Sequence, residues 1–197
     1  MISIDDYDIL KDAICSLKET SIDDHDGTIS YMSGSGVPVV NFDTVKDRYI
    51  DSLSVPETPA SNDAFFIDSR GEMFFIEFKA GVMERKIYEV RLKLFDSLLI
   101  LTDIIGKGVS FTRDHLNYIL VFDESKNPMQ EGEFTYQVTP SRERINSRYI
   151  KKGGSEFIRF RLRRFQRLYV KNVFTVDRDE FEKRFASKWA AEDVWWC

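Results

Sequence analysis

Two aromatic-rich runs separated by three residues are the feature that most constrains how this 197-residue chain can fold. The runs extend from Asp63 to Asp68 and from Glu72 to Lys79, and Ser69-Arg70-Gly71 lies between them. A three-residue connection needs a backbone position with positive φ, which glycine adopts without steric cost. The pattern therefore predicts a β-hairpin in which Asp63 lies directly opposite Glu77.

This register brings two carboxylates together at one edge of the hairpin. Asp63 and Glu77 would project side by side, and Lys79 would point to the same face because it follows Glu77 by two residues. Four apolar residues would continue that face into the core: Phe65, Ile67, Met73 and Phe75. Adjacent carboxylates raise each other's pKa unless a cation lies between them, and Mg²⁺ prefers such oxygen ligands. The pattern favours a metal site; a solvated ion-pair edge is the alternative.

The spacing of these residues resembles that of the PD-(D/E)XK nuclease superfamily. Asp63 is followed after fourteen positions by Glu77-Phe78-Lys79, at the end of the next strand. The resemblance implies that Asp63 and Glu77 bind Mg²⁺ or Mn²⁺, with the backbone carbonyl of Phe78 as a further ligand. It implies that Lys79 positions or activates the attacking water. The implied activity is Mg²⁺-dependent hydrolysis of phosphodiester bonds in nucleic acid, with DNA favoured as the substrate.

The same resemblance implies a fold and further contacts. The expected fold is α/β and restriction-endonuclease-like: a mixed sheet centred on the hairpin and flanked by helices, with a helical C-terminal portion. The helix after the motif often faces the nucleic acid in that superfamily, although a solvated helix face is the alternative here. Its candidate phosphate contacts are Lys86, Arg91 and Lys93. An upstream helical carboxylate is also part of the pattern. Three acids compete for that position: Asp43, Asp47 and Asp51.

Charge is distributed unevenly along this chain, whose net charge is -5. Residues 1–63 carry thirteen acids and four Lys or Arg, whereas residues 141–171 carry eleven Lys or Arg and two Glu. The basic segment predicts an anion-binding face that would contact phosphates rather than base edges. Three arginines, which a helix would bring towards one side, are its candidate contacts: Arg159, Arg163 and Arg167. Two solvated surfaces that pair with each other are the alternative.

Hydrophobic periodicity predicts the remaining elements of a single domain, with its core at about 37–124 and a basic, helical portion at 138–197. The predicted helices are Asp5–Glu19, Asp43–Leu53, Met83–Ile105 and the basic Ser141–Tyr149, and the predicted strands are Val37–Phe42 and Leu116–Asp123. Residues 156–168 fit both a strand and a helix, and we favour the helix. Asp177 and Glu180 resemble the capping pair of a last helix.

The cysteines, histidines and apolar runs of the chain limit which cellular compartment and which cofactors are expected. Cys15 and Cys197 lie at opposite ends of the chain, and His25 and His115 are isolated, so neither a disulfide framework nor a zinc site is expected. The two separated cysteines favour a reducing compartment and so predict a cytoplasmic protein. No apolar run is long enough to span a membrane, so no membrane partner is expected. Two other functions stay open beside the nuclease. One is a catalytically silent member of the same fold, and the other is a small acidic partner-binding module of the immunity or antitoxin type.

Overall fold

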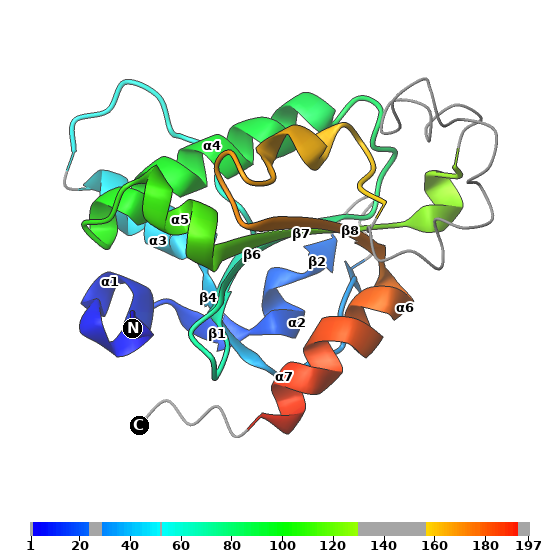
Figure 1. The fold of residues 1–197 in the computed structure, drawn as a ribbon, viewed down its shortest axis with the longest axis horizontal. Coiled ribbons are helices and arrows are strands. Elements are labelled where there is room, and N and C mark those ends of the chain that lie inside the picture. Colours follow the sequence, from blue (N-terminus) through cyan, green and yellow to red (C-terminus); the bar gives the residue numbers. More distant parts are fainter. Residues whose placement is uncertain (1, 24–28, 52, 130–156, 193–197) are drawn as a thin grey trace.

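A mixed six-stranded sheet forms the centre of the molecule (Figure 1). The computed structural model describes residues 2–23, 29–51, 53–129 and 157–192. The strand order is β1-β4-β5-β6-β7-β8; neighbours are antiparallel from β1 to β6, and β6, β7 and β8 are parallel to one another. The strands are β1 (Ile14–Ser16), β4 (Pro38–Asn41), β5 (Ala64–Ile67), β6 (Met73–Lys79), β7 (Leu116–Phe122) and β8 (Asn172–Asp177). A separate antiparallel pair consists of β2 (Ile22–Asp23) and β3 (Ser30–Tyr31).

Helices cover both faces of this sheet. The α-helices are α1 (Asp8–Lys11), α2 (Leu17–Thr20), α3 (Phe42–Asp51), α4 (Ile87–Ile104), α5 (Val109–His115), α6 (Arg178–Phe181) and α7 (Ser187–Ala191). The 3-10 helices are η1 (Ile4–Asp6), η3 (Glu124–Lys126) and η6 (Leu162–Phe165), and the π-helical turn η7 (Glu182–Ala186) joins α6 to α7. Helices α3, α4 and α5 lie on one side of the sheet, and α6 and α7 lie on the other (Figure 1). The structure thus confirms an α/β fold with a mixed sheet flanked by helices.

The predicted hairpin forms in the predicted register. Phe65 pairs with Phe75, and the amide of Asp68 donates to the carbonyl of Glu72 at 2.9 Å, which closes the three-residue connection. Gly71 has φ 78°, the left-handed conformation that the turn requires. Asp63 immediately precedes β5, and Glu77 lies near the end of β6. The two acids are therefore adjacent at the end of the hairpin that lies away from the turn.

The alternating side chains of the hairpin divide the apolar interior into two cores. Phe65 and Phe75 face α4, whereas Phe66 and Phe74 face the C-terminal helices, where both rings contact Trp189. Helix α4 contributes a buried stripe at helical spacing: Val90, Leu94, Leu98 and Leu101. This stripe fixes the rotation of α4 over the sheet. In the described residues, no helix has the length and apolar character needed to cross a membrane.

The prediction of one amphipathic helix from Asp5 to Glu19 was wrong. The segment instead forms α1 and α2 with β1 between them, and Ile14 pairs with Val40 of β4. Ser16 starts the second helix as a capping box with Glu19. The physical reason is that the chain crosses the sheet here: Leu10 belongs to the core under α4 and Leu17 to the opposite core.

The C-terminal portion is less helical than predicted. In residues 157–168 only η6 is helical, because Phe160, Arg161 and Arg167 adopt left-handed φ angles of 57°, 56° and 61°. Strand β8 was not predicted, so this portion also extends the sheet. The last helix begins where expected, since the side chain of Asp177 accepts from the amide of Glu180. The predicted basic helix Ser141–Tyr149 lies outside the described residues. Strands β4 and β7 and helix α3 form close to their predicted positions.

Candidate active site

The carboxylates of Asp63 and Glu77 converge on one cation, the ammonium group of Lys93. Nζ of Lys93 lies 2.9 Å from Oδ1 of Asp63 and 2.8 Å from Oε1 of Glu77. Lys93 reaches this position from α4, whereas the two acids come from the hairpin. The Glu77 side chain is completely buried, and that of Lys93 is 16% exposed. The structure therefore confirms that the two acids lie close enough to share one cation.

These three residues belong to a longer row of alternating charges. In order, the row is Asp63, Lys93, Glu77, Lys79, Glu89 and Lys86. Lys79 contacts Oε1 of Glu77 at 2.9 Å and Oε1 of Glu89 at 3.0 Å, and Lys86 contacts Oε2 of Glu89 at 2.9 Å. We call these six residues the charge row. Its three acids and three lysines balance, so the row compensates its own charge.

The backbone of β6 fixes the Asp63 carboxylate. The amide of Phe78 donates to Oδ2 of Asp63 at 2.7 Å, while Oδ1 of the same carboxylate faces Lys93. A strand residue directs its N–H and C=O to the same side of the strand. The carbonyl of Phe78 therefore lies on the Asp63 side of β6, which suits its predicted role as a further metal ligand.

Burial dominates the electrostatics of the two acids. Burial raises the pKa of Glu77 to about 7, and the neighbouring charge of Asp63 acts in the same direction. Burial also raises the pKa of Asp63, against the attraction of Lys93. For Lys93 itself burial lowers the pKa, but the charges of Glu77 and Asp63 outweigh it and raise the pKa overall. The site thus holds two carboxylates that need a cation in order to stay ionised.

Buried oxygen atoms at this site lack hydrogen-bond partners within the described ranges. They are Oε2 of Glu77 and the hydroxyl of Tyr118, whereas Oε1 of Glu77 faces the ammonium groups of Lys79 and Lys93 at 2.9 Å and 2.8 Å. Burial raises the pKa of that hydroxyl well above its ordinary value, and the negative charges of Glu77 and Asp63 raise it further. Unsatisfied buried oxygens in native structures often mark a missing ion or water. A divalent cation with its waters fits this donor set.

The protein itself would supply few ligands to such a cation. In the part of the chain that the structure describes, no three His, Cys, Asp or Glu side chains are grouped so that they could hold a metal ion. Mg²⁺ commonly keeps several waters and uses only one or two carboxylates. The residues that suit it here are Asp63, Glu77 and the carbonyl of Phe78.

The three candidate upstream acids all lie on α3, outside the charge row. Asp43 accepts a hydrogen bond from the hydroxyl of Ser61, two residues before Asp63, and Asp47 contacts Lys46 at 2.7 Å. Asp51 is exposed at the end of α3. Asp43 is thereby linked to the segment that leads into β5.

The predicted nucleic-acid contacts lie in different environments. Arg91, Arg163 and Arg167 are at least partly exposed, whereas Lys86 and Lys93 belong to the charge row.

Arg159 is buried, which corrects the prediction that it lies on a phosphate-binding surface. Its guanidinium group donates to the carbonyl of Asn127 at 2.9 Å and lies over the rings of Phe122 and Phe160. We therefore omit Arg159 from the proposed nucleic-acid surface. The prediction assumed a helix that would turn Arg159, Arg163 and Arg167 towards one side, and the left-handed residues remove that periodicity.

Sequence reasoning missed Glu89 and Tyr118 as members of this site and did not predict that Lys93 contacts both acids. Glu89 and Lys93 are four residues apart on α4, a spacing that places two side chains on one helix face, so their proximity could have been inferred. Tyr118 required the parallel register of β6 and β7, in which it pairs with Phe75. Comparisons with family models, curated proteins and solved structures found no match to this chain.

Proposed function

We propose that this protein hydrolyses phosphodiester bonds in nucleic acid, with DNA as the favoured substrate, at a site formed by Asp63, Glu77 and Lys79 with Mg²⁺ or Mn²⁺. One observation carries the proposal: carboxylate oxygens of Asp63 and Glu77 lie 2.9 Å and 2.8 Å from the same cation, the ammonium group of Lys93. The resemblance to the PD-(D/E)XK superfamily supplies the reaction class. The register of β5 and β6, which the three-residue connection predicts, supports the proposal because it brings the two acids together.

Each residue has a role that follows from its position. Asp63, Glu77 and the carbonyl of Phe78 would hold the metal, which when bound neutralises phosphate charge and activates water. The Phe78 amide keeps the Asp63 carboxylate oriented. Lys79 holds its ammonium between Glu77 and Glu89, so that it can orient the attacking water or stabilise negative charge on the phosphate. Lys93 compensates the two acids whenever no metal does so.

A cleavage assay tests this proposal. Labelled single-stranded DNA, duplex DNA and RNA are incubated with the protein in Mg²⁺, in Mn²⁺ or in EDTA. We expect cleavage that needs the metal and falls by at least a hundredfold in Asp63→Asn, Glu77→Gln and Lys79→Ala. Lys79→Ala should keep its affinity for uncleaved nucleic acid, because its loss is expected at the transition state.

Glu72→Gln is the matched control for the two acid variants. Glu72 lies on the same hairpin and also pairs with a lysine, Lys171, but at the turn end. Its activity should match that of the wild type. Equal losses in Glu72→Gln and Glu77→Gln would contradict the assignment, and so would cleavage that survives in EDTA.

Metal binding can be measured without cleavage. Mn²⁺ should raise the melting temperature of the wild type, because a ligand that binds only the folded state stabilises it by mass action. The double variant Asp63→Asn with Glu77→Gln should lose that increase. An increase of the same size in the double variant would place the metal elsewhere.

A catalytically silent protein of the same fold is the second candidate function, and the position of Lys93 favours it. The lysine already occupies the point between the carboxylates, and the charge row is neutral without a metal. In that case Mn²⁺ would leave the wild type unchanged but would stabilise Lys93→Met, in which the site is vacated. Stabilisation of both proteins supports the nuclease. The acidic partner-binding module would be favoured if neither metal nor nucleic acid bound.

A further inference from the structure

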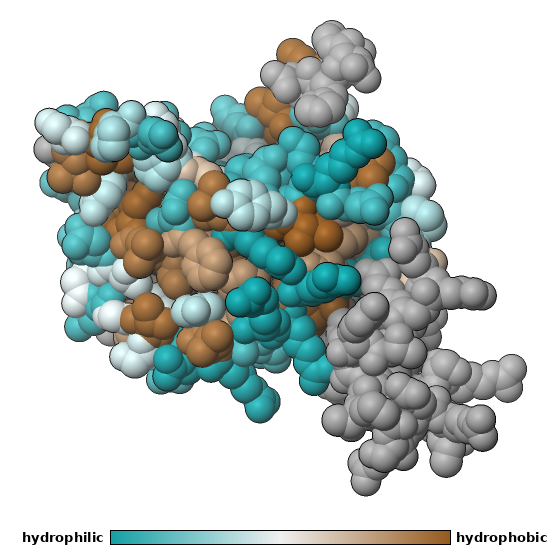
Figure 2. Space-filling view, turned by 90° about the horizontal axis from the view of Figure 1, so that it is seen from above, coloured by the Kyte–Doolittle hydropathy of each residue, from teal (hydrophilic) through white to brown (hydrophobic). Residues whose placement is uncertain are grey.

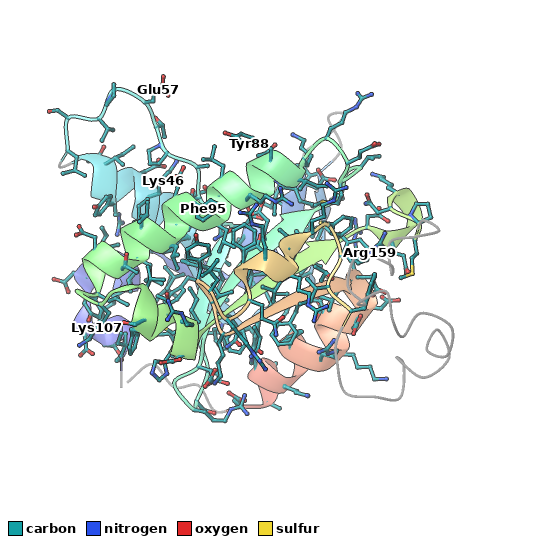
Figure 3. All side chains as sticks on the ribbon, turned by 45° about the horizontal axis from the view of Figure 1, so that its top comes forward. Lys46, Glu57, Tyr88, Phe95, Lys107 and Arg159 are labelled. Carbon is teal, nitrogen blue, oxygen red and sulfur yellow. The ribbon has the colours of Figure 1, made fainter. Side chains whose placement is uncertain are left out.

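A second group of cations lies beside the charge row, on another face of α4. Arg91 is two residues before Lys93, about 3 Å along the helix axis, and its side chain turns towards residues 157–168. A terminal nitrogen of its guanidinium group donates to the carbonyl of Arg161 at 3.4 Å. Phe95, four residues further along α4, packs against Phe165 and Tyr169, which fixes this segment alongside the helix (Figure 3).

Cations face cations in this group. Burial lowers the pKa of Arg91, and the positive charges of Arg164 and Arg161 lower it further. The Nε atom of Arg91 is buried and has no hydrogen-bond partner in the described residues. Whereas each lysine of the charge row contacts a carboxylate, no carboxylate among the described residues pairs with Arg91. Such an arrangement is stabilised when an anion binds between the guanidinium groups.

The backbone holds this group in place at a conformational cost. Phe160 and Arg161 adopt consecutive left-handed conformations, which are unfavourable for residues other than glycine. Packing of the Phe160 ring on Phe122 and on the Arg159 guanidinium maintains them. Strained backbone of this kind is often found at binding sites. Here it directs the carbonyl of Arg161 towards Arg91.

An exposed aromatic side chain lies next to the arginines. Tyr88 is 77% exposed and precedes Arg91 by three residues on α4, so the two are neighbours on the helix surface. Leu92 continues the exposed surface. The face seen in Figure 2, which α4 covers, shows apolar and hydrophilic side chains interspersed. Arginines next to an exposed ring are the combination that binds phosphates and stacks on bases.

We propose that Arg91, Arg161 and Arg164 bind the phosphates of a single-stranded nucleic acid and that Tyr88 stacks on one of its bases. The inference rests on the proposed function only in its choice of ligand. A strand bound here would run along α4, the helix that also supplies Lys93 to the candidate active site.

The test measures binding in EDTA, so that cleavage plays no part. Fluorescence anisotropy follows a labelled single-stranded oligonucleotide at several salt concentrations. Each phosphate neutralised on a single strand contributes about 0.7 to the slope of log affinity against log salt. Arg91→Gln with Arg164→Gln should therefore flatten the slope by about 1.4. Arg161 is retained because a substitution there would disturb the left-handed turn.

The matched control removes the same charge elsewhere. Arg48 and Arg70 each pair with an acid, at 3.6 Å and 2.7 Å, and Arg48→Gln with Arg70→Gln should leave the slope unchanged. Tyr88→Ala should weaken binding about tenfold without changing the slope, because stacking releases no counterions. Unfolding midpoints confirm that each variant is folded.

Several results would overturn the inference. An unchanged slope in the Arg91 and Arg164 variant, or an equal change in the control, removes the phosphate site. Tighter binding to duplex DNA together with an unaffected Tyr88→Ala variant removes the single-strand assignment. Polyglutamate that competes as well as the oligonucleotide would identify an acidic protein as the partner. Binding that depends on the arginines while Asp63→Asn retains full cleavage would keep this inference and reject the proposed active site.

Discussion

Lys93 and Arg91 are two residues apart on α4, yet their surroundings are opposite. Lys93 lies between two carboxylates whose charges outweigh burial and raise its pKa, whereas burial and then the charges of two arginines lower the pKa of Arg91. Lys93 is compensated from within the protein. Arg91 lacks a compensating carboxylate in the described residues.

This difference predicts how stability should respond when a positive charge is removed from the charge row or from the arginine group, which consists of Arg91, Arg161 and Arg164. Removing a cation from the charge row leaves buried acids without compensation, which is costly in a medium of low dielectric constant. Removing a cation from the arginine group relieves repulsion. The charge row should therefore contribute to folding stability, whereas the proposed compensation of Arg91 comes from a bound anion.

The largest expected effect comes from Lys93→Met. The substitution preserves much of the side-chain volume but leaves Asp63 and Glu77 facing each other, and we expect the free energy of unfolding to fall by about 3 kcal/mol. Urea denaturation in EDTA measures this loss. Arg91→Met is the matched control on the same helix and should change stability by less than about 0.5 kcal/mol. Equal decreases in the free energy of unfolding of Lys93→Met and Arg91→Met would show that the charge row and the arginine group do not differ in their contribution to stability.

The hairpin and its acids could be predicted because local rules determine them. The three residues from Ser69 to Gly71 set the turn, the turn sets the register, and the period of two places Glu77 and Lys79 on one face. The capping pair of Asp177 and Glu180 is equally local. In both cases the interacting residues are close together in the sequence, so their contacts follow from local geometry.

The rest of the site depends on packing between distant segments. Lys93 meets Asp63 and Glu77 only because the apolar stripe of α4 sets the rotation of that helix over the hairpin. Helical spacing placed Arg159 on a surface, but its interactions with Phe122 and Asn127 stabilise it in the interior. Leu10 and Leu17 fit one helix face, although they enter different cores. The periodicity of a segment does not predict which distant segments its side chains will pack against.

A smaller effect is expected at the outer end of the charge row. Glu89 is 39% exposed and contacts Lys79 and Lys86, so Glu89→Gln removes two ion pairs that water partly screens. We expect a loss of about 0.5–1 kcal/mol in the same urea experiment. Glu180→Gln, which breaks the exposed pair with Arg184 at 2.5 Å, is the control and should cost less. If Glu89→Gln lowered the free energy of unfolding as much as Lys93→Met, the contribution of each ion pair in the charge row would not depend on its burial.

The smallest expected effect is a different response of the charge row and the arginine group to salt concentration. Ions screen charges near the surface far more than buried ones, since the Debye length falls from about 10 Å at 0.1 M to about 3 Å at 1 M. Salt should therefore relieve the repulsion around the partly exposed Arg91 and leave the buried contact between Lys93 and Glu77 nearly unchanged. Raising the salt concentration over this range should stabilise the wild type more than Arg91→Gln, by about 0.2–0.5 kcal/mol. Sodium chloride is used because sulfate and phosphate would bind as ligands. If the two proteins respond equally, the arginines do not repel one another enough to favour an anion, and the contrast with the charge row loses its electrostatic basis.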